Sequence, residues 1–105
     1  MLRFALRQAL VTVMLMAPAS AASPDIQRGK AYAQRHCARC HAIDLTSRSP
    51  LKTAPPFRLL HNSYPVETLA ESLAEGISTG HPAMPAAELE PDQIHALLVF
   101  LKSLE

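Results

Sequence analysis

The chain has 105 residues, of which 49% are hydrophobic and 18% are charged, and its formal net charge is +1. This length accommodates one small domain and excludes a multidomain enzyme. The nearly balanced charge gives no indication of a strongly basic nucleic-acid-binding module, so no nucleic-acid partner is expected. Nine prolines favour short helices joined by rigid loops over long uninterrupted elements.

The first 22 residues have the composition of a secretory signal peptide. Arg3 and Arg7 precede a short apolar run over residues 9–17, and small residues follow at residues 19–22. The run is shorter than the roughly 20 apolar residues that a membrane-spanning helix needs. We therefore expect export, cleavage after residue 21 or 22, and a mature domain over residues 23–105 without stable membrane insertion. The alternative is an uncleaved N-terminal anchor.

Charges are segregated along the expected mature segment. Without the two arginines of the leader, eight basic residues stand against nine acidic ones. Seven basic residues lie within residues 28–58 against Asp44 alone, whereas residues 67–105 carry seven acids against Lys102. This asymmetry would give the folded protein a dipole that steers encounters with a partner. Two ordinarily solvated faces are the alternative interpretation.

Three helices are expected in the mature segment. The first begins at Ser23-Pro24-Asp25, which supplies a capping side chain, a proline at the first helical position and an acid, and it runs toward residue 37. The second covers residues 65–77, with Gly76 as a left-handed cap. The third begins near Pro91 and keeps apolar residues on one face to residue 104. Proline-rich connections are expected over residues 46–63 and 77–90. No alternating pattern predicts a strand, so the fold class is all-α with long ordered loops.

Both cysteines lie in Cys37-Ala38-Arg39-Cys40-His41, a C-x-x-C-H motif. This pattern indicates covalent attachment of one c-type haem. Two thiols three positions apart at a helical turn can each add to one vinyl group of the same porphyrin. His41 then falls beneath the iron, where its imidazole serves as the proximal ligand. A large apolar cofactor would also give the long loops something to pack against.

Other chemistry is compatible with two closely spaced cysteines. A thioredoxin-like site needs a surrounding βαβ pattern, which is missing. A disulfide between Cys37 and Cys40 would close a very small loop and stabilise little. A zinc site would combine both cysteines with two histidines from His41, His61 or His81, but none of the usual zinc-finger spacings is present.

A haem iron also needs a sixth ligand or an open coordination position. Met84 lies between Pro82 and Pro85 and is the only methionine outside the leader. A thioether is a soft, neutral ligand that favours ferrous iron and raises the reduction potential. A lone methionine is more often a filler of the hydrophobic core, and His81 is the competing ligand.

Beyond the motif itself, the mature segment resembles the small class I c-type cytochromes of the bacterial periplasm. Gly29 lies eight residues before Cys37, where such cytochromes have a glycine that lets the terminal helix approach closely. Leu97 and Phe100 match the Leu-x-x-aromatic motif of the C-terminal helix that crosses it. The string over residues 80–85, Gly-His-Pro-Ala-Met-Pro, is similar to the family's distal-ligand loop.

The same resemblance assigns roles to individual residues. Residues 53–57, Thr-Ala-Pro-Pro-Phe, look like the family's proline segment, whose carbonyl accepts a hydrogen bond from the proximal histidine. This implies that Pro55, with Pro56 as the second choice, orients His41. It also supports Met84 over His81 as the distal axial ligand. Ala33 departs from the pattern, because the family often has an aromatic residue there, and Tyr32 is expected to take part of that role.

The resemblance implies a cytochrome c fold and a periplasmic carrier of single electrons. Haem c would be bound by Cys37 and Cys40, with His41 and Met84 as axial ligands and no reaction of its own. Redox proteins are the expected partners, and an acidic partner would dock near the basic residues Arg28, Lys30, Arg35 and Arg39. The alternatives are a haem subunit of a larger oxidoreductase and a gas- or ligand-binding haem protein in which Met84 is displaced.

Overall fold

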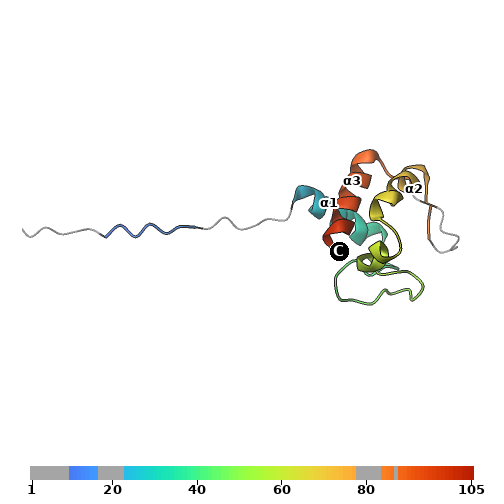
Figure 1. Cartoon of the computed structure of the whole chain (residues 1–105), viewed down its shortest axis with the longest axis horizontal. Helices are drawn as coiled ribbons and strands as arrows, with labels where there is room; N and C mark the ends of the chain where they lie inside the picture. Colours follow the sequence, from blue (N-terminus) through green and yellow to red (C-terminus); the bar gives the residue numbers. More distant parts are fainter. Residues whose placement is uncertain (1–9, 17–22, 78–83, 87) are drawn as a thin grey trace, which may run out of the picture.

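The computed structural model describes residues 10–16, 23–77, 84–86 and 88–105 (Figure 1). Its elements, in chain order, are α1 (Pro24–His36), the 3₁₀ helices η1 (Phe57–Asn62) and η2 (Val66–Thr68), α2 (Leu69–Glu75) and α3 (Pro91–Ser103). Every element within these residues is helical. The all-α prediction with three main helices is therefore confirmed.

Helix α1 begins where the local signals place it. The Ser23 hydroxyl accepts a hydrogen bond from the Ile26 N–H at 3.2 Å, and Pro24 occupies the first turn, where no N–H is needed. At the other end, the Cys37 N–H donates to the Ala33 carbonyl at 2.9 Å. The helix thus delivers the first cysteine directly from its last turn.

The segment between residues 57 and 77 differs from the sequence prediction. The second helix was expected from residue 65, but its first turn is the 3₁₀ helix η2, and α2 covers Leu69–Glu75. The Thr68 N–H and hydroxyl both donate to the Pro65 carbonyl, at 3.1 and 2.7 Å, which tightens this turn. Gly76 ends α2, as predicted, and its φ of 97° is positive, but its ψ of 101° lies outside the left-handed helical region that was expected. Helix η1 lies inside the segment expected to be a connection.

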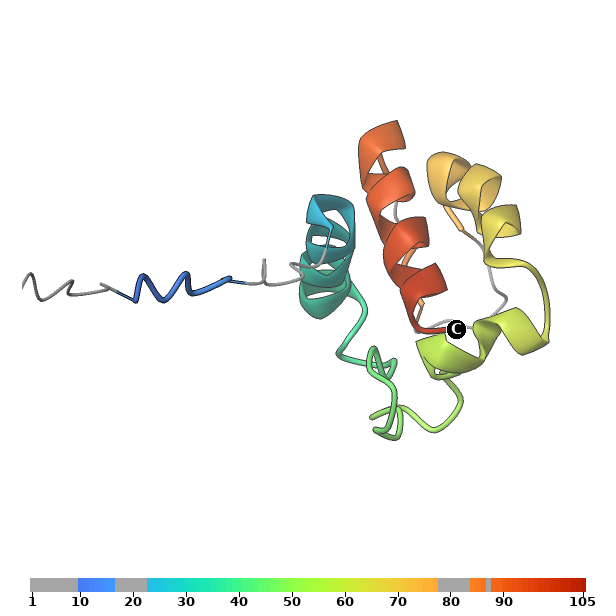
Figure 2. The same cartoon turned by 60° about the vertical axis from the view of Figure 1, so that its left-hand side comes forward.

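Helix α3 lies between α1 and α2, with η1 below it and η2 leading directly into α2 (Figure 2). Its Gln93 side chain accepts from the Glu90 N–H at 3.1 Å, which caps the helix start. Because α3 touches both other α-helices, it needs a wide apolar surface. Its buried residues are Ile94, Ala96, Leu97, Phe100 and Leu101.

Ala33 occupies the position where the family often has an aromatic residue, and the neighbouring Tyr32 supplies an aromatic ring instead. Ala33 has no exposed surface, so the space beside it is filled by neighbouring core side chains. Tyr32 is half-buried against the same core, and its ring centroid lies 4.4 Å from that of His36. The aromatic ring is therefore supplied by the residue before Ala33 and packs against His36 of the same helix.

The contact between α1 and α3 depends on Gly29. A Cβ placed on Gly29 would lie 2.1 Å from the Ala96 carbonyl oxygen and 2.7 Å from the Phe100 Cβ. The first of these atoms belongs to the backbone and cannot rotate away. Any side chain at this position would force the two helices apart.

Replacing Gly29 with alanine is expected to destabilise the haem-bound protein by about 2 kcal/mol, because the cost of overpacking exceeds the roughly 1 kcal/mol gained in helix propensity. Guanidinium unfolding measures this loss. The exposed neighbour Lys30 provides the control, since Lys30→Ala should change the free energy of unfolding by less than about 0.5 kcal/mol. A Gly29→Ala variant as stable as the parent would contradict the close approach of the helices.

Candidate functional site

The C-x-x-C-H motif folds into a single tight turn at the end of α1. The N–H groups of Cys40 and His41 both donate to the Cys37 carbonyl, at 3.2 and 3.0 Å. This turn places the two cysteines and the histidine on one short piece of backbone. The arrangement is the one that attachment of two thiols to a single planar group requires.

Cys37 and Cys40 are both free and half-buried, so the disulfide considered from the sequence is not formed in this structure. Burial raises the pKa of the Cys37 thiol to about 11, because the charged thiolate is poorly solvated there. A neutral thioether does not carry this cost. The environment of Cys37 therefore suits a covalently capped sulfur better than a reactive or metal-binding thiolate.

His41 is oriented by two contacts. Its Nδ1 lies 2.8 Å from the Pro55 carbonyl oxygen, and its ring centroid lies 4.9 Å from that of Phe57. A carbonyl oxygen can only accept, so Nδ1 carries the proton in this hydrogen bond. The lone pair then resides on Nε2, which is the state a metal-binding imidazole needs. Phe57 was not singled out from the sequence, although its position directly after the Pro-Pro pair is the signal that would have identified it.

Residues 42–57 form a loop whose ends are joined by hydrogen bonds. The Phe57 N–H donates to the Ala42 carbonyl at 2.9 Å, and the Ala42 N–H donates to the Ser49 hydroxyl at 3.0 Å. Ala42 and Phe57 are both buried. This closure holds Pro55 beside His41 although the two residues are 14 positions apart.

Asp44 organises the outer part of this loop. One of its carboxylate oxygens accepts from the N–H groups of Thr46 and Ser47, at 3.0 and 2.6 Å, and the other accepts from the Ser47 hydroxyl at 2.6 Å. Arg58, at the start of η1, donates to the Ser47 carbonyl at 2.7 Å. The hydrogen bonds from Ser47 and Thr46, together with the nearby Arg58 charge, lower the pKa of Asp44.

The lowered pKa gives a test of the Asp44 turn. Because the folded value lies below the ordinary value of 3.8, the ionised carboxylate stabilises the fold above pH 3.8, and this contribution disappears as the pH falls through the folded pKa. Asp44→Ala should therefore lower the thermal unfolding midpoint of the haem-bound protein at pH 7, with the difference shrinking below pH 3.8. Thr46→Ala keeps the backbone N–H and should show no such pH-dependent difference. A deficit in Asp44→Ala that is constant from pH 3 to 7 would contradict this role.

Met84 lies in the loop between α2 and α3 and is half-buried. The Leu89 N–H donates to the Leu73 carbonyl at 2.9 Å, and Leu89 itself is buried. The loop that carries Met84 is therefore fastened near its end to α2. His81, the competing ligand, lies outside the described residues. His61 is exposed at the end of η1. In the described part of the chain, no three histidine, cysteine or carboxylate side chains gather to hold a metal ion.

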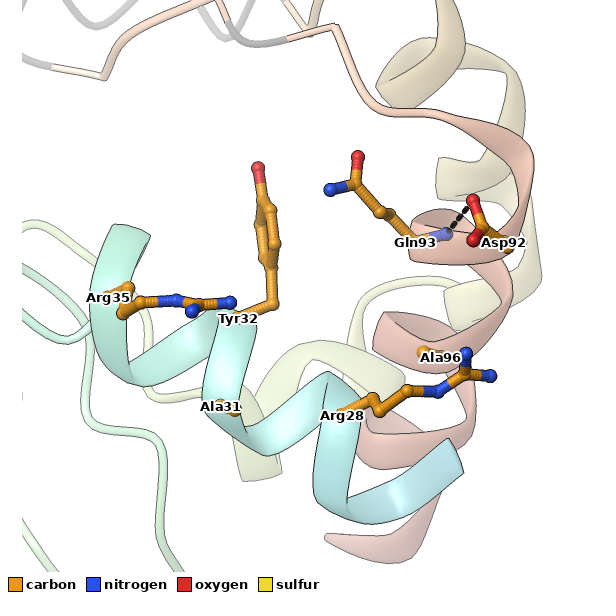
Figure 3. Close-up of a pocket in the computed structure, with 7 residues that line it drawn as sticks. All are labelled: Arg28, Ala31, Tyr32, Arg35, Asp92, Gln93 and Ala96. Carbon is orange, nitrogen blue, oxygen red and sulfur yellow. Dashed lines mark hydrogen bonds between the residues drawn. The ribbon is translucent and has the colours of Figure 1, made fainter. Parts of the chain in front are cut away.

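A shallow groove of about 230 Å³ runs between α1 and α3, on the helix pair (Figure 3). Arg28, Tyr32 and Arg35 line it from α1, and Asp92 and Gln93 line it from α3. Arg28 also forms an ion pair with Asp25. None of the residues predicted to hold the cofactor lines this groove, so we assign it no role in the site.

Comparison with known families gives the class of this protein. The family model of cytochrome c matches residues 26–105, and the chain therefore belongs to the cytochrome c family. Neither the curated proteins nor the solved structures compared with the chain give a significant match. Members of this family bind haem c covalently through the cysteines of a C-x-x-C-H motif and serve in haem-based electron transfer.

The geometry around Cys37–His41 fits that cofactor. Both free thiols belong to the same turn of the chain, and the neighbouring imidazole has its Nε2 lone pair available. The half-buried site of Cys37 favours a neutral sulfur. The cofactor of this protein is one covalent haem c.

Proposed function

We propose that the protein is an exported electron carrier in which His41 and Met84 are the two axial ligands and Cys37 and Cys40 are the covalent attachment points. The observation that carries the proposal is the hydrogen bond from His41 Nδ1 to the Pro55 carbonyl. It leaves the lone pair on Nε2, where it is available for ligation, and it restrains the ring plane. Bound haem c supplies a one-electron couple between ferric and ferrous iron.

The role proposed for Met84 is supported by its position. It is half-buried, it is followed directly by Pro85, and its loop is fastened by the Leu89–Leu73 hydrogen bond. A proline next to the ligand restricts the backbone that presents the sulfur. A thioether held in this way favours the ferrous state and keeps the sixth position closed to substrates. We therefore propose no enzymatic reaction for this protein.

Export to the periplasm is supported by the leader-like sequence of residues 1–22, which precedes the matched family domain. Residues 10–16 are exposed, with Leu10 and Leu15 90 and 92% exposed, and they pack on no part of the described domain. Among the described residues, no helix is both long and apolar enough to cross a membrane. We propose that residues 1–22 are a signal peptide and residues 23–105 the mature monohaem domain.

The optical spectrum of the purified, exported protein tests cofactor and ligands together. A pyridine haemochrome assay should give one covalent haem c per chain. The oxidised protein should show the far-red absorption band of a methionine sulfur bound to ferric iron. A haem-bound protein without that band would contradict the assignment of Met84 while leaving the attachment at Cys37 and Cys40 intact.

Two matched variants separate Met84 from the competing His81. Met84→Ala should abolish the far-red band and allow the reduced protein to bind one equivalent of carbon monoxide at neutral pH, because the sixth position becomes open. His81→Ala should retain the band and resist carbon monoxide, as the parent protein should. Rapid carbon monoxide binding by the parent would instead favour a ligand-binding haem protein.

A further inference from the structure

The loop over residues 42–58 borders a second concavity, of about 400 Å³, which is open to solvent. Arg48, Lys52 and Arg58 line it together with Ser49, Ala54 and Pro56, and no acidic residue contributes to its wall. Ala54 and Pro56 flank Pro55, so the concavity lies beside the segment that orients His41.

Two of the three cations in this wall are uncompensated. Arg58 donates to backbone carbonyls of the Asp44 turn, and its charge acts on the Asp44 carboxylate. Arg48 and Lys52 are exposed, and within the described residues they form no hydrogen bond or ion pair. Asp44, the one acid within residues 26–66, directs its carboxylate into its own turn. The loop therefore presents positive charge that the protein itself does not neutralise.

The charges on the rest of the molecule limit which kind of anionic partner can bind at this loop. Lys102 is paired with Glu67, whereas Glu71, Glu75, Glu88, Glu90, Asp92 and Glu105 leave the α2–α3 side acidic. An extended polyanion such as a nucleic acid would meet this repulsive side. A small cluster of carboxylates on a protein surface needs to meet only the loop.

The distribution of charge favours a docking face other than the one expected from the sequence around Arg28, Lys30, Arg35 and Arg39. Arg28, on α1, is paired with Asp25 and lines the shallow α1–α3 groove instead of the loop. Lys30 and Arg35 remain exposed on α1. The concave, acid-free basic wall lies in residues 48–58, after the C-x-x-C-H turn and not before it.

We propose that the pocket formed by Arg48, Lys52 and Arg58 receives a carboxylate-bearing surface of an acidic redox-protein partner, and that this contact sets the partner beside the His41 side of the cofactor. The inference rests on the proposed electron-carrier function. Arg58 is the positionally fixed cation of the pocket, because its guanidinium donates to the Ser47 carbonyl of the Asp44 turn. Arg48 and Lys52 supply the two cations that are available to the partner's carboxylates.

A titration with hexaglutamate as the acidic probe tests this pocket on the haem-bound protein. Amide chemical shifts at low ionic strength should move mainly within residues 48–58. The double variant Arg48→Gln/Lys52→Gln should weaken hexaglutamate binding about fivefold, since two exposed charge pairs are lost. About 0.5 M salt should abolish the shifts in the parent protein.

The control is Lys30→Gln/Arg35→Gln, which removes the same two charges from α1. It should leave hexaglutamate binding within about twofold of the parent. Equal weakening by the two double variants, or shifts centred on α1, would overturn the proposed pocket and return the docking face to that helix. The proposed pocket would also be overturned if Arg48→Gln/Lys52→Gln bound hexaglutamate as well as the parent but had an altered midpoint potential. That result would mean that the two cations interact with the haem carboxylates and not with a partner.

Oxidants of opposite charge give a second readout. Each event moves one electron from the reduced protein to hexacyanoferrate(III), giving hexacyanoferrate(II), or to tris(phenanthroline)cobalt(III), giving the cobalt(II) complex. Arg48→Gln/Lys52→Gln should slow the first reaction several-fold and accelerate the second. Equal rates in the variant and the parent would contradict the proposed pocket. If the protein exchanges electrons with both oxidants but fails the hexaglutamate test, the proposed pocket is wrong and the proposed electron-carrier function is unaffected.

Discussion

The absence of a side chain at Gly29 is the constraint on which the helical frame depends. It allows the backbone of α1 to lie against the Ala96 carbonyl of α3, closer than any other residue would permit. Because α3 also contacts α2, this one contact sets the direction of α1 relative to the rest of the core. The direction of α1 in turn fixes where Cys37 leaves its last turn. Covalent attachment of a rigid cofactor therefore begins from a point that helix packing has already defined.

After Cys37, short connections bring together the residues that surround His41, the proposed proximal ligand. The C-x-x-C-H turn presents His41, and the loop that follows returns Pro55 and Phe57 to the same imidazole. The loop is closed by the Ala42–Phe57 backbone bond and is held on its outer side by Arg58 of η1, which donates to the Ser47 carbonyl. The tautomer of His41 is thus determined by backbone geometry, which no side-chain substitution at Pro55 directly removes.

The limits of sequence reasoning follow from the range of each signal. Caps and prolines are local, so the starts of α1 and α3 were predicted within a residue, and the C-x-x-C-H motif states its chemistry within five positions. Helix η1 was missed because a 3₁₀ segment has no 3.6-residue apolar repeat to detect. The contacts of Phe57 with His41 and of Arg58 with Ser47 join residues 16 and 11 positions apart through loop geometry, which no periodic pattern encodes. The Pro55 contact was anticipated only through family resemblance.

Closure of the 42–57 loop by its own hydrogen bonds also bears on how the protein can diverge. The loop is joined at Ala42 and Phe57, and the α1–α3 contact at Gly29 lies outside it. Substitutions or length changes at its tip would leave the helix crossing untouched, because loop length adds only slowly to the entropy of closure. The proposed partner contact at the loop tip and the helix crossing at Gly29 thus lie in separate parts of the chain. Evolution can therefore change the surface that the loop tip presents to partners while the helix crossing at Gly29 stays the same.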